Sequence, residues 1–348
     1  MSFVERFCNS KDALKNKKFI VVGDFCLDRY MYLDSRLDQR FDYCDLDTYF
    51  MYDEKLYPGG AGNVAKNILS MGATVICIGL IGNDGNGYDL KRVLKNYGAD
   101  VDCLYKYDNR ITNTYYRPIR RSDKKDKYMN ELLFINPKLT GVDQEKDIID
   151  ALEKNINVVD GIVIVEQFDK DSYSSITPKV KKYVNSMANK FSDKFFLVDS
   201  RSNINKYTNM YVKCNQYEFM KAMHGKGAIR TENTKINIVC EIKKYLSFHS
   251  NRGIYVTLGR KGMAYGNNEL VTIVDAFSIV GETDTCGAGD SASAGIIAAL
   301  CTGYSDTEAI VIGNLCAYVT VRQIGVTGII TYERLIQAYK EIADGIHM

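Results

Sequence analysis

Short apolar runs alternate with longer segments of helical periodicity along most of the chain. The run at residues 19–24 ends in Gly and Asp, as a buried strand does where it leaves a sheet. Helical periodicity marks a segment that opens at residues 59–69 and another that ends at Gly98. Such alternation predicts an α/β fold with a mostly parallel sheet and helices on both faces. Further strands are predicted at residues 75–81, 161–165, 195–199 and 254–258, and further helices near residues 143–155, 174–190 and 232–248.

Two segments depart from this alternation. Between Tyr30 and Tyr57, tyrosines and carboxylates alternate with apolar residues, which is typical of a half-exposed strand pair. We expect this segment to join a second one and form a small β-sheet lid. The sequence has no repeat and no linker, so we expect a single domain over residues 1–348, with the lid inserted from about residues 30–57 and 103–135. An antiparallel hairpin is predicted at residues 262–265 and 270–274.

Composition argues against several classes of function. A net charge of +2 offers no electrostatic basis for binding nucleic acid or an anionic membrane. The N-terminus is polar and no apolar run approaches 18 residues, so we expect a cytoplasmic protein. The 10 cysteines form no C-x-x-C pair and the 3 histidines lie far apart, which indicates free thiols and no zinc site.

Residues 283–291 read T-D-T-C-G-A-G-D-S, and a small and apolar run that suits a closely packed helix follows. Gly287, Ala288 and Gly289 then lie at the helix start, where unpaired backbone N–H groups favour an anion. Asp290 beside an anion makes sense as a base that takes a proton from an attacking hydroxyl. A Gly-rich turn with Asp290 as a helix cap explains the same spacing.

Ligands of an open parallel sheet bind at the carboxyl ends of its strands. Polar residues fall at predicted strand ends or helix starts in five places: Asp24 with Asp28, Asn63, Asn215 with Glu218, Thr257 with Gly259, and Asp290. A basic patch over residues 117–127 fits a solvated loop or, through Arg117, a contact to a phosphate. This convergence predicts one ligand site at the edge of the sheet.

The string D-T-x-G-A-G-D at residues 284–290 resembles, without a gap, the signature of the ribokinase family of sugar kinases, the phosphofructokinase-B type. In that family the final acid is the catalytic base and the G-A-G backbone forms the anion hole. The resemblance therefore gives these roles to Asp290 and to Gly287, Ala288 and Gly289. It spans roughly residues 18–335 and implies a ribokinase-like fold.

Weaker motifs follow in the chain order of the family. On the sugar side they are G-D-x-x-x-D, G-G-x-x-x-N and the basic residue of the lid. The resemblance implies that the second acid, Asp28, binds sugar hydroxyls and that Gly59, Gly60 and Asn63 form a sugar-binding segment. We expect Asp24 and Arg117 to contact the substrate beside them.

On the nucleotide side the motifs are N-x-x-E and T-L-G-x-x-G. A helix-start capping pattern explains N-x-x-E equally well. The resemblance places the nucleotide near Asn215, Thr257, Gly259, Gly262 and Asn314. It places magnesium near Glu218, through water, and a monovalent cation such as potassium near Asp284 and Thr285.

The resemblance implies in-line transfer of the γ-phosphoryl group of ATP to a sugar hydroxyl. No P-loop sequence is present, so the G-A-G amides and Mg²⁺ must take over the role of the P-loop lysine. The lid would close over the sugar and exclude water. In relatives such lids often pair between subunits, so we expect a homodimer through the lid.

The N-terminal half resembles most the kinases of D-glycero-D-manno-heptose 7-phosphate, in residues 21–30, 58–65 and 114–117. The substrate loop differs, because residues 35–43 read S-R-L-D-Q-R-F-D-Y where that family carries a Ser-Pro-Glu run. A kinase of fructose, ribose or a phosphofructose is the alternative among enzymes. A sugar- or nucleotide-binding regulator without turnover is the alternative outside them. We expect no counterpart of the nucleotidyltransferase domain that is fused in the heptose family.

Overall fold

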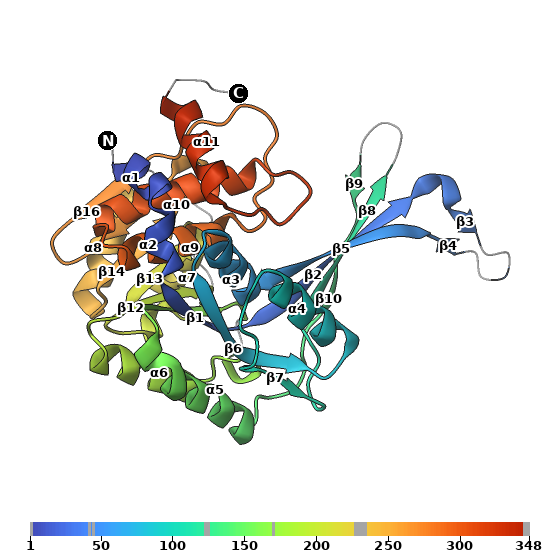
Figure 1. Ribbon diagram of the computed structural model, residues 1–348, viewed down its shortest axis with the longest axis horizontal. Coiled ribbons are helices and arrows are strands. Elements are labelled where there is room, and N and C mark those ends of the chain that lie inside the picture. The colour runs from blue at the N-terminus through green and yellow to red at the C-terminus, as the bar shows by residue number, and fades with distance from the viewer. Residues whose placement is uncertain are drawn as a thin grey trace.

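The computed structural model describes residues 3–40, 43, 46–121, 126–168, 171–225 and 235–343. Its main body is built on one large sheet, whose strands are β1 (Lys18–Gly23), β6 (Thr74–Gly82), β7 (Leu104–Tyr107), β11 (Gly161–Glu166), β12 (Phe195–Ser200), β13 (Tyr211–Asn215), β14 (Gly253–Thr257), β15 (Met263–Gly266) and β16 (Val271–Val274). In the described residues their order is β16-β15-β14-β13-β12-β11-β1-β6-β7 (Figure 1). The strands from β14 to β7 run parallel, and β15 and β16 add the expected antiparallel hairpin at one edge.

Helices cover both faces of this sheet, because successive residues of its strands point to opposite sides. In β1, Phe19 and Val21 enter one core, whereas Ile20 and Val22 enter the other. The first core includes residues of α1 (Phe3–Asn9), α2 (Lys11–Lys15), α3 (Ala61–Ser70), α4 (Gly85–Asn96), α9 (Ala288–Cys301), α10 (Asp306–Val321) and α11 (Tyr332–Ala343). The second includes residues of α5 (Val142–Asn155), α6 (Pro178–Lys190), α7 (Gln216–His224) and α8 (Lys235–Phe248).

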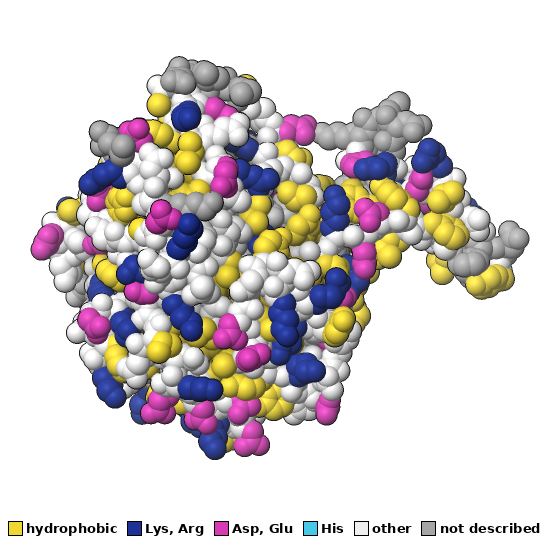
Figure 2. Space-filling view, viewed as in Figure 1, with side chains coloured by type: hydrophobic (Ala, Val, Ile, Leu, Met, Phe, Trp, Pro, Cys, Tyr) yellow, Lys and Arg dark blue, Asp and Glu magenta, His cyan; other side chains and the backbone are white. Residues whose placement is uncertain are grey.

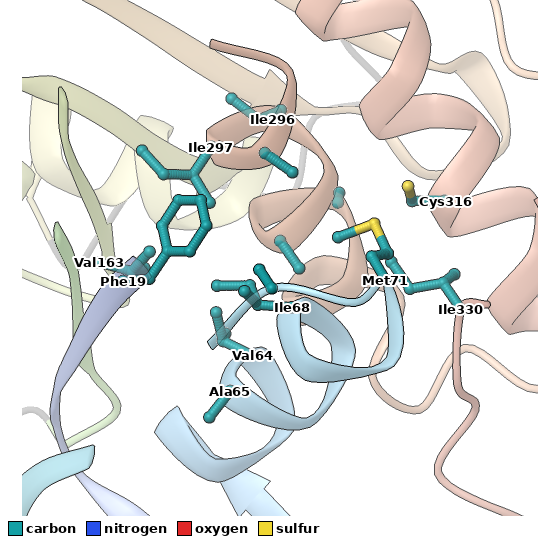
Figure 3. Close-up of a cluster of buried hydrophobic side chains, with 14 of the residues drawn as sticks. Phe19, Val64, Ala65, Ile68, Met71, Val163, Ile296, Ile297, Cys316 and Ile330 are labelled. Atoms are coloured by element: carbon teal, nitrogen blue, oxygen red, sulfur yellow. The ribbon is translucent and has the colours of Figure 1, made fainter. Parts of the chain in front are cut away.

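The packing of α3 against α9 has a consequence for function. Val64 and Ile68 of α3 lie in the same fully buried cluster as Ile296 and Ile297 of α9, next to Phe19 of β1 (Figure 3). Burying each of these side chains stabilises the fold by about 1.5–3 kcal/mol. The contact fixes the two helices side by side, and their first turns meet at the carboxyl edge of the sheet.

A second sheet forms the lid. Its strands are β2 (Phe25–Asp34), β5 (Met51–Gly60), β8 (Thr114–Arg121), β9 (Lys127–Tyr128) and β10 (Leu132–Phe134). In the described residues they are ordered β10-β8-β2-β5, with β9 paired to β8. The sheet extends away from the body, and the short pair β3 (Gln39–Arg40) and β4 (Asp47–Thr48) lies at its far end (Figure 1). The base of the lid lies directly beside the edge of the central sheet, because β2 begins two residues after β1 ends.

The structure confirms the predicted α/β fold with its parallel sheet, two helical layers and lid. The structure differs from the prediction in the place of one strand and the start of one helix. Residues 104–107, expected in the lid, form β7 and pair with β6 in the central sheet. Helix α6 begins at Pro178 rather than near residue 174, because the side chain of Thr177 caps it by accepting a hydrogen bond from the N–H of Val180. Residues 41–42, 44–45 and 122–125 of the expected lid, and 232–234 of an expected helix, lie outside the described residues.

Three features of the described residues concern membranes, disulfides and metals. None of their helices is long and apolar enough to cross a bilayer. Their cysteines are free thiols. They hold no group of three or more His, Cys, Asp or Glu side chains arranged to bind a metal ion.

Candidate active site

The N-terminus of α9 presents unpaired backbone donors. Gly287 is the N-cap and has φ 78°, in the left-handed region that favours glycine. Among the described residues, the N–H groups of Gly289 and Asp290 have no acceptor, whereas the N–H of Ala288 donates to the carbonyl of Thr285 at 3.2 Å. These two donors lie at the positive end of the helix dipole, an arrangement that binds anions.

A cavity of about 560 Å³ opens beside this helix end. Asn314 helps to shape its wall, because its Nδ2 donates to the carbonyls of Val274 and Asp275 at 3.3 and 3.4 Å. Much of the lining is apolar and suits a flat heterocyclic base: Met263, Phe277, Ile279, Ala317, Tyr318 and Val321. Residues predicted for the nucleotide and the anion hole line the same cavity: Thr257, Gly259, Gly262, Asn314, Ala288 and Gly289. Thr285, predicted for a monovalent cation, lines it too.

Asp290 lies in the first turn of α9 and meets Asn63 from the first turn of α3. Its Oδ2 accepts a hydrogen bond from Nδ2 of Asn63 at 2.7 Å. A Cβ on residue 287 would lie 2.6 Å from that Nδ2, so glycine at the N-cap is what makes room for the contact. Burial, reinforced by the charge of Asp199, raises the pKa of Asp290 to about 6, although the hydrogen bond from Asn63 opposes the rise. A carboxylate with this pKa is a base suited to neutral pH.

The other polar atom of the Asn63 side chain is available to a ligand. Asn63 is 1% exposed, and its Oδ1 has no hydrogen-bond partner within the described ranges. A buried amide oxygen without a donor is costly, so this atom is suited to accept a hydrogen bond from a hydroxyl of a bound molecule.

Asp28 and Arg117 come from the base of the lid and lie close to each other. Nη2 of Arg117 lies 3.6 Å from Oδ1 of Asp28, and Oγ1 of Thr327 lies 3.5 Å from its Oδ2. Burial raises the pKa of Asp28, while Arg117 and Lys66 hold it back. The guanidinium of Arg117 also stacks near the ring of Tyr30, 5.4 Å from its centroid. A pair of opposite charges at this depth offers both donors and acceptors to a polyhydroxylated ligand.

The predicted sugar-side glycines lie against these groups. A Cβ on Gly59 would approach the carboxylate of Asp28 to 3.1 Å, and Gly60 is the N-cap of α3 with φ 56°. Both positions therefore keep the base of the lid close to Asp28 and Asn63.

Asn215 and Glu218 form a reciprocal cap at the start of α7. Oδ1 of Asn215 accepts from the N–H of Glu218, and Oε2 of Glu218 accepts from the N–H of Asn215, both at 2.8 Å. The capping interpretation of N-x-x-E is thus confirmed. Burial raises the pKa of Glu218, the hydrogen bond from Asn215 opposes the rise, and the charge of Asp199 adds to it. Glu218 therefore lies close enough to Asp199 for the two charges to influence each other.

Comparison with known proteins agrees with this geometry. A model of the pfkB family of carbohydrate kinases matches residues 17–331. The chain belongs to this family. It is therefore a carbohydrate kinase, a phosphotransferase with an alcohol group as acceptor.

Curated relatives of this pfkB kinase include the "Bifunctional protein HldE" of Aliarcobacter butzleri, 27% identical over 89% of this chain, and that of Nitratiruptor sp., 28% identical over 88%. The matched region is 62% of the length of each, so the chain spans less than two thirds of these relatives.

Solved structures share the fold of the pfkB kinase. Arabidopsis thaliana ribokinase, in complex with ribose and ATP, superposes with a TM-score of 0.68 at 18% identity, covering 93% of this chain and 99% of its own. Escherichia coli phosphofructokinase-2, in complex with potassium, gives 0.69 at 16% identity, covering 94% and 99%.

Asp24 does not share the site with Asp28. It is 2% exposed, and its carboxylate accepts hydrogen bonds from the hydroxyl of Ser174 and from the N–H groups of Ser175 and Gln167 at 2.8–3.0 Å. These bonds tie the end of β1 to the segment after β11. The expected contact between Asp24 and the sugar is therefore not supported, and we assign Asp24 a structural role.

Asp284 accepts hydrogen bonds that fix the loop leading into α9. Its Oδ1 accepts from the N–H of Cys286 at 3.0 Å and its Oδ2 from the N–H of Gly325 at 3.2 Å. Thr285, next to it, is exposed. The two carboxylate oxygens hold the loop at 284–286 against the segment at 325–327, which also reaches Asp28 through Thr327.

The basic patch divides into two parts. Arg117 lies in the site, whereas Arg120 pairs with Asp38 and Arg121 pairs with Asp126 at 3.6 Å on the outer part of the lid. The solvated-loop interpretation therefore fits Arg120 and Arg121 but not Arg117. Lys124 and Lys125 lie outside the described residues.

Sequence reasoning missed two charged residues beneath the anion hole, Lys213 and Asp199. Lys213 is 4% exposed, and its Nζ lies 2.8 Å from Oδ2 of Asp199. The only sequence signal was a charged residue within the apolar run at residues 211–214, which itself was not predicted as a strand.

Proposed function

We propose that this carbohydrate kinase transfers the γ-phosphoryl group of ATP to D-glycero-D-manno-heptose 7-phosphate, at the 1-position. The observation that carries the proposed chemistry is the hydrogen bond between Asn63 and Asp290 at the open end of α9. It puts a base with a pKa of about 6 within one helical turn of the free N–H groups of Gly289 and Asp290.

In the proposed reaction, Asp290 accepts the proton of the attacking sugar hydroxyl. Asn63 holds Asp290 through Nδ2 and receives a second sugar hydroxyl at its unpaired Oδ1. The N–H groups at the start of α9 stabilise the negative charge on the phosphoryl oxygens. Asp28 and Arg117 orient the sugar, and the lid above them excludes water as a competing acceptor.

Magnesium fits the donors that Glu218 offers. Its Oε2 is held by the N–H of Asn215, while its Oε1 accepts no hydrogen bond from the described residues. Mg²⁺ prefers carboxylate oxygen and retained water, so Glu218 would hold it through water. When bound, the ion supplies charge neutralisation on the phosphates.

A monovalent cation, potassium, is proposed next to Asp284 and Thr285. Asp284 organises the loop backbone through its bonds to Cys286 and Gly325. Loop carbonyls and the threonine hydroxyl are hard oxygen donors of the kind that such an ion takes.

The choice of sugar rests on two supports. The relatives named HldE (heptose kinase/adenylyltransferase) match most of this chain. A cationic Arg117 at the base of the lid suits an acceptor that already carries a phosphate. Fructose, ribose and a phosphofructose are the competing acceptors.

We also propose a homodimer formed through the lid. Apolar side chains of the lid are exposed, among them Met51 at 48%, Leu132 at 61%, Leu133 at 52% and Phe134 at 52%. They lie on β5 and β10, the two outer strands of the lid sheet, and Figure 2 shows hydrophobic side chains gathered on this arm. Outer strands with exposed apolar residues are suited to pairing with another copy.

The test is ADP release from ATP in the presence of a panel of acceptors: heptose 7-phosphate, fructose, fructose 6-phosphate and ribose. We expect the highest kcat/KM with the heptose phosphate, and a product with phosphate at the 1-position by ³¹P NMR. A higher kcat/KM with another sugar would overturn the choice of acceptor. Nucleotide binding without turnover on any sugar would overturn the kinase assignment in favour of a binding regulator.

A further inference from the structure

Lys213 is a buried ammonium directly beneath the first turn of α9. It belongs to β13 and is 4% exposed. The point where a Cβ would stand on Gly289 lies 2.9 Å from its Nζ. Because residue 289 has no side chain, the ammonium can approach the anion hole from below. This explains why the third residue of G-A-G is glycine.

Asp199 fixes the position of this ammonium. It lies opposite Lys213 in the ladder between β12 and β13, and its Oδ2 accepts from Nζ at 2.8 Å. The same Oδ2 accepts from Oγ of Ser293 at 2.7 Å, one turn further along α9. Asp199 therefore joins two strands of the sheet to α9, the helix whose N-terminus is the proposed anion hole.

The pair with Asp199 satisfies only one of the three N–H bonds of the ammonium. Within the described residues Lys213 has no second hydrogen-bond acceptor. A buried ion pair is rarely retained for stability, because an apolar pair of similar volume is often as stable. Two unsatisfied N–H bonds at this depth make a purely structural explanation weaker still.

Charged groups from three further elements face this pair. Glu218 comes from α7, Asp290 from α9, and Arg201 from the turn after β12. Glu218 and Asp290 each interact electrostatically with Lys213, with Asp199 and with Arg201. Lys66 of α3 is a further cation within range of Asp290. Burial alone would lower the pKa of Lys213, but Asp199 and then Glu218 and Asp290 raise it, so the ammonium stays charged at assay pH.

We propose that Lys213 supplies the positive charge behind the anion hole, the role that a P-loop lysine has in other kinases, and that Asp199 positions it. The inference rests on the proposed kinase function and deepens it. Across Gly289, the charge of Lys213 attracts the terminal phosphate and also acts on the base Asp290. Lys213 is therefore a positioning residue. The sequence alone had given the role of the P-loop lysine to the G-A-G amides and magnesium. Under this proposal a lysine side chain shares that role.

The first test measures nucleotide binding without turnover. The affinities of Mg²⁺–ADP and of a non-hydrolysable Mg²⁺–ATP analogue are measured by titration calorimetry for the parent and Lys213→Met. If Lys213 acts on the terminal phosphate, the variant should lose about 10-fold or more in affinity for the triphosphate analogue and little for ADP. An equal loss for both nucleotides, or no loss, would contradict the proposal.

The chain provides a matched control. Lys181 of α6 is likewise buried and pairs with Glu166 at 2.7 Å, on the other face of the sheet from α9. We expect Lys181→Met to change both nucleotide affinities equally, if at all. If Lys213→Met does not fold, the double variant Lys213→Met/Asp199→Asn removes both charges together, and the same selective loss is expected.

The second test is the pH profile of kcat/KM. Burial raises the pKa of Asp290 most, Asp199 adds to the rise, and Lys213 opposes it. We therefore expect Lys213→Met to move the acid limb to higher pH and Asp199→Asn to move it to lower pH, with Lys181→Met unchanged. Profiles of both variants that overlay the parent would overturn the proposal. If the parent has no turnover, the proposed function fails, while the calorimetric test still decides the role of Lys213.

Discussion

Two aspartates four residues apart illustrate how strongly local surroundings decide the role of a side chain. Asp24 and Asp28 are both nearly inaccessible, at 2% and 5% exposure. Asp24 receives its hydrogen bonds from the protein itself, at Ser174, Ser175 and Gln167. Asp28 instead faces Arg117 and Thr327 at longer distances and has capacity left for a ligand.

This contrast gives a paired prediction. Asp24→Ala leaves buried donors without an acceptor, and we expect it to lower the free energy of unfolding by about 3 kcal/mol, with little change in sugar KM. Asp28→Asn keeps the shape but removes the charge, and we expect it to raise sugar KM about 10-fold or more with a smaller change in stability. Denaturant unfolding and steady-state kinetics measure the two effects. The reverse assignment of the effects would contradict these roles.

The pKa of Asp290 predicts a pH dependence. Its pKa rises to about 6 in the folded protein from an ordinary value of 3.8, so the base is protonated and inactive below about pH 6. We expect kcat/KM to rise with pH up to an apparent pKa near 6 and then level off. A profile that is flat between pH 5 and 7.5 would contradict the assignment of the base.

At the level of elements, much of the proposed chemistry depends on a single helix start, that of α9. Gly287 has a positive φ and lies against Asn63, so Gly287→Ala adds backbone strain and also places a Cβ only 2.6 Å from Nδ2, which is too close. We expect the variant to lose about 10-fold or more in kcat, because the overlap displaces Asn63 from Asp290.

The other end of α9 supplies the control for this variant. Gly303 has a similar φ of 87°, but a Cβ there would meet nothing within 4 Å. We expect Gly303→Ala to lower stability by a similar strain of about 1 kcal/mol while kcat stays near that of the parent. Equal losses of kcat in both variants would show that strain alone, and not the overlap with Asn63, explains the effect.

The sequence could predict elements whose pattern is local. Uninterrupted apolar runs located β1, β6, β11, β12 and β14, and the G-A-G-D string located the start of α9. It could not predict features that depend on distant partners. The role of Asp24 depends on Ser174, 150 residues away, and the place of β7 depends on its pairing with β6. Lys213 was missed because its burial depends on Asp199 in the neighbouring strand.

At the scale of the whole molecule, the lid is the part that extends away from the main body (Figure 1). It shares its base with the site through Asp28 and Arg117, while its outer strands expose apolar side chains. We therefore propose that Asp28 and Arg117 serve the sugar, while the apolar side chains along the two outer strands serve a second copy of the chain.

The dimer prediction follows from this division. We expect the parent to show twice the mass of one chain by light scattering, and Leu132→Asp to shift the equilibrium towards the single chain, because it places a charge on an exposed outer strand. Val158→Asp is the control, since Val158 is 58% exposed but lies next to α5, away from the lid. A parent that remains a monomer at high concentration would contradict the prediction.

The measurement that tests the central claim most directly compares turnover and nucleotide affinity in Asp290→Asn. The folded state favours the protonated form of Asp290, so the stabilising effect of that form is lost as pH rises through about 6, and its charge is a cost above that pH. We therefore expect the variant to be at least as stable as the parent at pH 8 and to bind the ATP analogue with similar affinity. Its kcat should fall by about 10²–10⁴-fold. A variant that folds, binds nucleotide and turns over as fast as the parent would contradict the account.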